Sequence, residues 1–153
     1  MNKVLFLLGL LGAAWGDAAM ADVTTLCHGS ERTIWSCRAG AKLYALCASM
    51  NLGEEEGYLQ YRAGGPSRGA FRFPGRLTHP RGHFTFSLLA HGASLAFERG
   101  AYRYEITEDI KGDTSILVSL PQGRMVAIDC ADATQTLTEN ATIDLFKSAG
   151  LAE

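Results

Sequence analysis

Acidic residues are missing from one long stretch of this chain: there is no Asp or Glu between Gly57 and Phe97. The same stretch contains five arginines, which are Arg62, Arg68, Arg72, Arg76 and Arg81. It cannot neutralise its own charge, so its arginines need an anion from elsewhere in the chain or from a partner. The whole chain has a net charge of −2, which argues against a nucleic-acid-binding protein.

The sequence also lacks the motifs of common catalytic and metal sites. No G-x-S-x-G is present, and no close C-x2-C pair offers zinc ligands. The longest run of adjacent carboxylates is Glu54–Glu56, in an expected loop. His79, His83 and His91 lie at expected turns without a nearby carboxylate, which favours ordinary hydrogen bonding over metal binding. We therefore expect no catalytic residues, no metal and no cofactor.

Long apolar runs are absent except at the N-terminus. There, Met1–Lys3 gives a positive start, and the run VLFLLGLLGAAWG is shorter than the ~20 residues that cross a bilayer. Ala19-Met20-Ala21 follows with the small-x-small pattern of a signal-peptidase site. We predict a signal peptide at 1–21 and one β-rich domain at 22–153, periplasmic or secreted, with no stable membrane insertion after cleavage. A retained anchor helix is the alternative.

Four cysteines lie in the predicted mature chain: Cys27, Cys37, Cys47 and Cys130. An even number of cysteines in an exported domain predicts two disulfides, and four cysteines allow three connectivities. The spacing leaves all three open. In each of them one bridge closes a long loop to Cys130.

Apolar and polar residues alternate with a period of two through most of the chain, which is typical of half-buried strands. Short strands with turn signals between them predict an all-β fold, a single antiparallel meander closed as a small barrel or folded as a sandwich. The predicted strands lie in RTIWSC, KLYALC, YLQYR, FRF, HFTFSLLA, SLAFERGAYRYEI, SILVSL and RMVAIDC.

Two local details of this fold can be predicted. In SLAFERGAYRYEI, a two-residue turn at Arg99-Gly100 places Phe97 opposite Tyr102. The C-terminal segment NATIDLFKSAGL has helical periodicity instead, with Asn140 as its expected N-cap and Gly150 as its expected stop. A short helix should therefore pack on the β domain.

The segment from Gly57 to Arg76 offers a candidate binding face. In YLQYR, the side chains of Tyr58, Gln60 and Arg62 share one face of the strand. If residues 58–62 pair with residues 70–74, Arg72 joins that outward face. Tyr and Arg are enriched in interface hot spots, so we expect Tyr58, Gln60, Arg62 and Arg72 to bind a protein with an acidic surface.

Internal neutralisation of these arginines is the alternative. It predicts that the fold places carboxylates beside the basic strands, and acidic residues flank the stretch on both sides. The candidates are Glu54–Glu56, Glu98, Glu105, Glu108 and Asp109.

Several segments carry a family resemblance. SCRAGAKLYALCAS, GYLQYRAG, AHGASLAF and GAYRYEI resemble an uncharacterised family of small exported bacterial β-rich proteins, over about Cys37 to Cys130. The resemblance implies export and a β-rich fold but no activity. A looser likeness, in size, export, cysteine placement and aromatic strands, is to periplasmic C-type lysozyme inhibitors, which are small disulfide-bearing β-barrels. The inhibitory loop of that group is not found, so no functional residue is carried over.

Together, these features predict an exported, periplasmic, non-enzymatic binding module, one form of which is a protein inhibitor of an envelope hydrolase. A small-ligand or metal-binding envelope protein is the alternative, and a small hydrolase is the third reading. A protruding loop, a concave pocket or a histidine cluster in the structure would separate them.

Overall fold

A computed structural model describes residues 25–65 and 68–152. The predicted signal peptide at 1–21 and its cleavage site lie outside these residues. The described part contains ten strands and one helix. They are β1 (Glu31–Ala39), β2 (Lys42–Ser49), β3 (Leu59–Gly65), β4 (Arg68–Phe73), β5 (Thr85–Leu89), β6 (Gly92–Arg99), β7 (Tyr102–Asp109), β8 (Thr114–Ser119), β9 (Met125–Asp129), β10 (Asp132–Gln135) and α1 (Asn140–Ser148).

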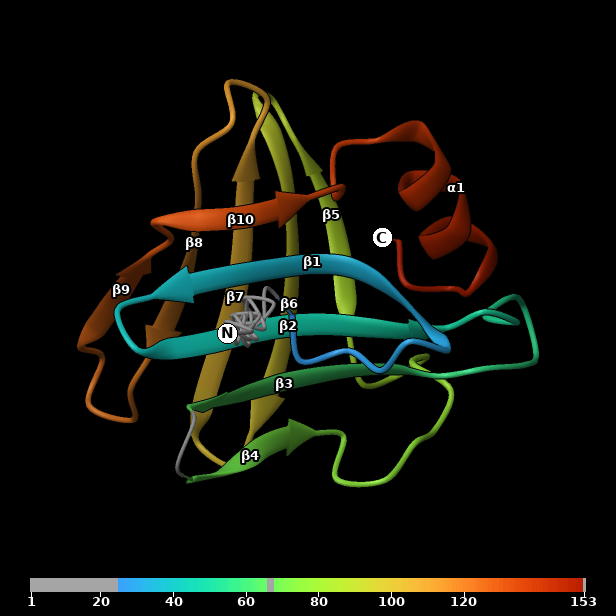
Figure 1. Cartoon of the computed structure of the whole chain (residues 1–153). Helices are drawn as coiled ribbons and strands as arrows, with labels where there is room; N and C mark the ends of the chain where they lie inside the picture. The colour runs from blue at the N-terminus through green and yellow to red at the C-terminus, as the bar shows by residue number, and fades with distance from the viewer. Residues whose placement is uncertain (1–24, 66–67, 153) are drawn as a thin grey trace, which may run out of the picture.

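The strands form two antiparallel five-stranded sheets packed face to face. The first sheet has the order β10-β1-β2-β3-β4, and the second has the order β5-β6-β7-β8-β9. The strands of the first sheet run across those of the second in Figure 1. The sheets do not close into one barrel, so the predicted all-β meander is confirmed in its sandwich form. Each consecutive pair of strands within a sheet is a hairpin, apart from β10, which returns to pair with β1.

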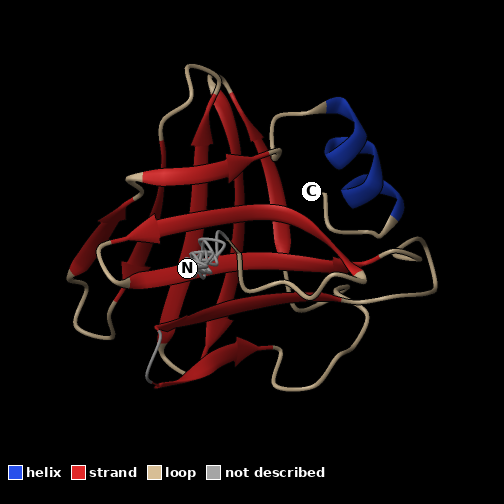
Figure 2. Cartoon of the chain, viewed as in Figure 1, coloured by secondary structure: helices blue, strands red, loops and turns tan. Residues whose placement is uncertain are grey.

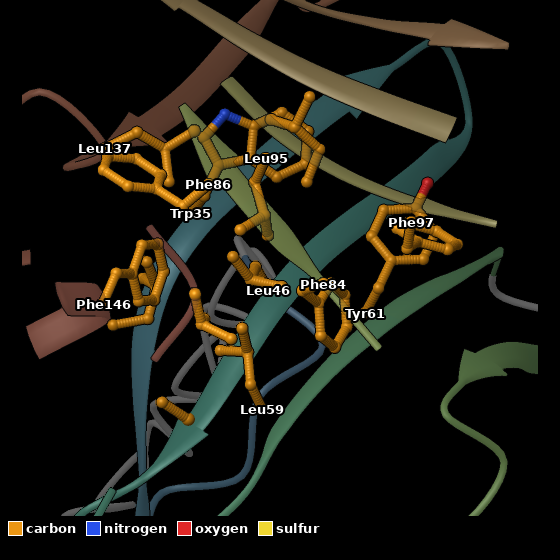
Figure 3. Packing of buried hydrophobic residues seen from close by; sticks show 14 of the residues in the cluster. Trp35, Leu46, Leu59, Tyr61, Phe84, Phe86, Leu95, Phe97, Leu137 and Phe146 are labelled. Atoms are coloured by element: carbon orange, nitrogen blue, oxygen red, sulfur yellow. The ribbon is translucent and has the colours of Figure 1, made fainter. Parts of the chain in front are cut away.

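Aromatic and aliphatic side chains fill the space between the sheets. Trp35 and Leu46 come from the first sheet and Leu95 from the second, and all three are fully buried. Figure 3 shows these residues beside Phe86 of β5 and Phe146 of α1. Indole Nε1 of Trp35 also donates a hydrogen bond of 2.9 Å to Oγ1 of Thr114, which joins β1 to β8 across the core. Buried residues from both sheets and from the helix therefore build one shared core.

The β6–β7 hairpin differs from its predicted register by two residues. Phe97 stands opposite Tyr104, and Arg99 stands opposite Tyr102, so the turn is Gly100-Ala101 rather than Arg99-Gly100. Gly100 has φ +60° and Ala101 does not have a positive φ, which fits a type II′ turn with glycine at its first central position. The prediction placed the glycine one position too late in the turn.

The C-terminal helix covers one end of the sandwich, as Figure 2 shows. Its N-cap is Glu139, without a side-chain capping bond, so the prediction of Asn140 as cap was wrong. Gly150, with φ +71°, ends the helix as predicted. After this turn, the backbone N–H of Phe86 in β5 donates to the carbonyl of Leu151 at 2.7 Å, and a parallel bridge follows between Phe86 and Ala152.

All four cysteines form disulfides, Cys27–Cys47 and Cys37–Cys130. The two bridges lie on opposite faces of the first sheet. Cys37 stands opposite Tyr44 in β2, and Cys47 is three residues further along that strand, so its side chain points to the other face. Disulfides of this kind persist in an oxidising environment outside the cytoplasm. Among the described helices, none is long and apolar enough to cross a membrane.

Candidate binding sites

The structure brings the predicted face together but buries half of it. Arg62 stands opposite Arg72 in the β3–β4 register, so the two share a face as predicted. Arg72 is exposed and Tyr58 is half-buried. Gln60 and Arg62 are only 2% and 4% exposed. The expectation that Gln60 and Arg62 lie on an exposed face was therefore wrong.

The N-terminal segment of the described chain causes this burial. Residues 25–30 lie over the outer face of β2 and β3, and the disulfide Cys27–Cys47 fixes them there (Figure 1). Cys47 stands directly opposite Gln60 on that face. The carbonyl of Leu26 accepts a hydrogen bond of 3.0 Å from Nη1 of Arg62. A face that alternation predicts as outward is thus covered by chain from outside the sheet.

Glu31, at the start of β1, is the anion that neutralises Arg62. Nη1 and Nη2 of Arg62 each donate to one carboxylate oxygen of Glu31 at 2.7 Å, and the two side chains are only 5% and 1% exposed. Such a bidentate pair is the strongest form of an ion pair between side chains. Nε of Arg62 donates to Oε1 of Gln60, and Nε2 of Gln60 donates to the carbonyl of Pro74. Among the described residues, no buried side-chain nitrogen or oxygen of this network lacks a hydrogen-bond partner.

Two further donors converge on the same carboxylate. The hydroxyl of Tyr58 and the backbone N–H of His28 each donate to Glu31 at 2.6 Å. Burial by itself raises the pKa of Glu31. The hydrogen bonds from Arg62, Tyr58 and His28, with the charge of Arg62, outweigh burial and hold the pKa at about 2 rather than the ordinary 4.5. The hydrogen bond between Tyr58 and Glu31 is also the main reason why the pKa of Tyr58 is raised.

The alternative of internal neutralisation is therefore the correct one for Arg62, but with a different anion. None of the flanking carboxylates that the sequence offered bonds to Arg62 in the described structure. Glu55 instead pairs at 3.5 Å with Arg81, where both side chains are exposed. Glu31 was missed because it lies 31 residues before Arg62 and belongs to no recognisable motif. The available signal was strand pairing: Glu31 stands opposite Ser49 in β2, on the same sheet face as Cys47, and Cys47 stands opposite Gln60 in β3.

Glu108, near the end of β7, is a second buried carboxylate. It is 2% exposed and has no cationic partner among the described residues. Its two oxygens accept the backbone N–H groups of Leu137 and Thr138, both at 3.1 Å, and the hydroxyl of Thr138 at 2.7 Å. These donors belong to the connection between β10 and α1. Glu108 therefore attaches the C-terminal helix to the second sheet.

A cleft opens at the end of the sandwich where Glu108 lies. Its volume is about 710 Å³. The β5–β6 turn, the β7–β8 turn and the chain between β9 and β10 form its walls. The residues of its lining that carry carboxylates are Glu108, Asp109, Asp113, Asp129 and Asp132, and none of the lining residues is Lys or Arg.

The electrostatics of this cleft favour an organic cation over a metal ion. Glu108 is already engaged by its own three hydrogen bonds, and Oδ1 of Asp109 accepts the backbone N–H of Lys111 at 2.7 Å. In the described part of the chain, no three ligand atoms of the cleft lie within 4.8 Å of one another. A metal needs ligands that converge more closely than this. A guanidinium or ammonium group, which interacts with separated carboxylates, fits this spacing better.

The histidines lie in separate surroundings. Nε2 of His79 lies 2.9 Å from the carbonyl oxygen of Gly53, and the ring of His83 packs edge-on against Phe73. His91 lines the acidic cleft. The described residues contain one cluster with the spacing of metal ligands, formed by Cys27, Glu31 and Cys47, and its two thiols are joined as a disulfide.

A second, smaller cavity of about 390 Å³ lies near the β4–β5 connection. Aromatic side chains of Phe73, Phe84 and Phe97 line it; Phe73 stacks on Phe97, and Phe84 packs edge-on against both. Its two charged residues, Glu98 and Arg103, lie 3.7 Å apart and neutralise each other. This cavity therefore offers less to a charged ligand than the acidic cleft does.

Comparison with known proteins adds no relative: no family model, no curated protein and no solved structure matches this chain.

Proposed function

We propose that this protein is an exported, non-enzymatic binding module that receives a basic group of a protein partner in the acidic cleft. The observation that carries the proposal is a cleft of about 710 Å³ whose lining contains five acidic residues and no Lys or Arg. Two disulfides support a location in the periplasm or outside the cell. An inhibitor that presents this cleft to a basic envelope hydrolase is one form of such a module.

The chemistry of the partner differs from the sequence-based expectation. The sequence predicts an acidic partner because alternation places Gln60, Arg62 and Arg72 on one outward face. Arg62 is satisfied by Glu31, and Arg72 alone stays exposed on that face. Four aspartates and Glu108 line an open cleft whose lining contains no Lys or Arg, so a basic partner is the better electrostatic complement.

The first experiment is an NMR titration of the protein with a tri-arginine amide peptide, and with a tri-glutamate peptide for comparison. Only the basic peptide should shift the amide resonances of the cleft residues His91, Gly112 and Asp113. Binding should weaken as salt rises, because exposed charges are screened over ~8 Å at physiological ionic strength.

A matched pair of variants tests the location. Asp113→Asn/Asp132→Asn should weaken binding of the basic peptide by about tenfold or more, whereas Asp144→Asn, on the exposed side of α1, should leave it unchanged. Equal binding of both peptides, or unchanged binding to the double variant, would contradict the proposal. The same variants then serve as bait with envelope extract, to identify the natural partner.

A further inference from the structure

The outer edge of β9 is open to pairing. β9 is the last strand of its sheet, and no described residue pairs with its outer side. Two hydrogen bonds to β8 fix which backbone groups are free: Cys130 N–H donates to Thr114, and Leu120 N–H donates to Arg124. Every second residue of β9 therefore bonds to β8. The N–H and C=O groups of Met125, Ala127 and Asp129 point away from the sheet.

This edge is protected only by the shortness of β9 and by Asp129 at its end. Met125 and Val126 are 65% and 41% exposed, and β9 contains no Lys and no Pro. The opposite edge of the same sheet is covered, because Phe86 of β5 pairs with the chain at Leu151 and Ala152. The second sheet therefore has one edge, β5, that is paired with the C-terminal chain, and one apolar edge, β9, that no described residue covers.

The open edge leads directly into the acidic cleft. β9 ends at Asp129, and the cleft lining continues through Cys130 and Ala131 to Asp132. An extended peptide beside β9 would therefore bring one of its ends to the cleft. The charge of the cleft is complementary to a Lys or Arg at that end.

We propose that the partner contributes an extended segment that adds to β9 as an additional strand and places a basic residue at the cleft. This inference rests on the proposed function and specifies how the partner is held. The main-chain hydrogen bonds of the added strand supply affinity, and the basic residue supplies specificity. Exposed Met125 and Val126 offer apolar contacts to its side chains.

The test is a selection of random peptides of about twelve residues, displayed in a library, against the whole mature protein. In the selected peptides, apolar residues should alternate with polar ones, and Arg or Lys should lie near one end. In the complex, the amide protons of Met125, Ala127 and Asp129 should exchange with solvent more slowly, whereas those of Val126 and Ile128 should change little because they already bond to β8.

A matched pair of variants tests the edge of β9 and leaves the acidic cleft unchanged. Ala127→Pro deletes an N–H that makes no bond within the sheet, and proline is tolerated on edge strands. It should weaken the selected peptides by about tenfold or more, whereas Ala127→Ser should bind normally. Peptides N-methylated at alternate positions provide the same test on the unmodified protein, and one of the two methylation patterns should abolish binding.

The outcomes separate this inference from the proposed function. Peptides that need Asp113 and Asp132 but bind Ala127→Pro normally would overturn the added strand and leave the cleft proposal standing. Slow exchange at β9 that appears without peptide and grows with protein concentration would show a second copy of the chain at the edge, which also overturns it. Failure to select any basic peptide would overturn both.

Discussion

Glu31 and Glu108 are two buried carboxylates that attach peripheral segments to the sandwich by different means. Glu31 is neutralised by the guanidinium of Arg62 and helps to hold residues 25–30 on the first sheet. Glu108 is solvated by two backbone N–H groups and one hydroxyl, and holds the connection to α1 on the second sheet. Burying a charge is unfavourable unless it is paired or well hydrogen-bonded, and this fold uses both solutions.

The difference between them lies in what remains when the carboxylate is removed. Loss of Glu31 leaves a buried cation without its counterion. Loss of the charge at Glu108 leaves neutral donors, which are less unfavourable to bury than a charge. The two sites should therefore respond with different magnitudes to matching substitutions, and only the first should depend on a second charged residue.

The largest effect is expected for Glu31→Gln. It should lower the free energy of unfolding by about 3–5 kcal/mol, because Arg62 keeps its charge in a buried position. Denaturant unfolding measures this. The double variant Glu31→Gln/Arg62→Met should recover much of the loss, since both charges are then gone. Arg72→Gln, at the exposed position opposite Arg62, should change stability by no more than about 0.5 kcal/mol. Equal losses in the three variants would refute this role for the ion pair.

The second prediction concerns acid. Because the pKa of Glu31 is lowered from 4.5 to about 2 in the folded protein, its contribution is fully present above pH 4.5 and is lost as the pH falls toward 2. The loss is on the order of 3 kcal/mol over this range. Other carboxylates titrate there too, so the measurement is the stability difference between wild type and Glu31→Gln as a function of pH. That difference should shrink below pH 4.5, and a constant difference would disprove the linkage.

The smallest effect is expected for Glu108→Gln, at about 1–3 kcal/mol. The amide can accept one set of hydrogen bonds but turns its NH2 group toward a backbone N–H. Hydrogen exchange should therefore speed up at Leu137 and Thr138, and the β3 amides near Arg62 should be unaffected. If hydrogen exchange at Leu137 and Thr138 stays at the wild-type rate, Glu108 does not attach the connection between β10 and α1.

The same contrast explains which contacts were predictable. Arg62 and Arg72 share a face because alternation and hairpin pairing are local, and the register confirms it. Glu31 was not predicted, because it reaches Arg62 only across the assembled sheet, where it stands opposite Ser49 of β2 and β2 pairs with β3. The acidic cleft was not predicted for a similar reason: its aspartates lie at the β7–β8 turn and at the connection between β9 and β10, two segments that meet only in the folded sandwich.

The disulfides show where local information ends. The hairpin of β1 and β2 places Cys37 and Cys47 on opposite faces, so these two cannot pair with each other. That argument needs the turn at Gly40-Ala41, and it still leaves two partners for each cysteine. Residues 25–30 fold over the outer face and bring Cys27 to Cys47, whereas the end of β9 brings Cys130 to the inner face.

The sequence by itself determined strands β1 to β9, most turns, the terminal helix and the oxidation of all four cysteines, because each follows from alternation, turn glycines or cysteine number. It did not predict β10, which forms by pairing with β1. Only the tertiary structure decided which outward faces are exposed. Alternation tells which side of a sheet a residue occupies, but not what lies on that side. Gln60 and Arg62 are buried under residues 25–30, whereas Met125 and Val126, on a strand of similar pattern, stay open at an edge.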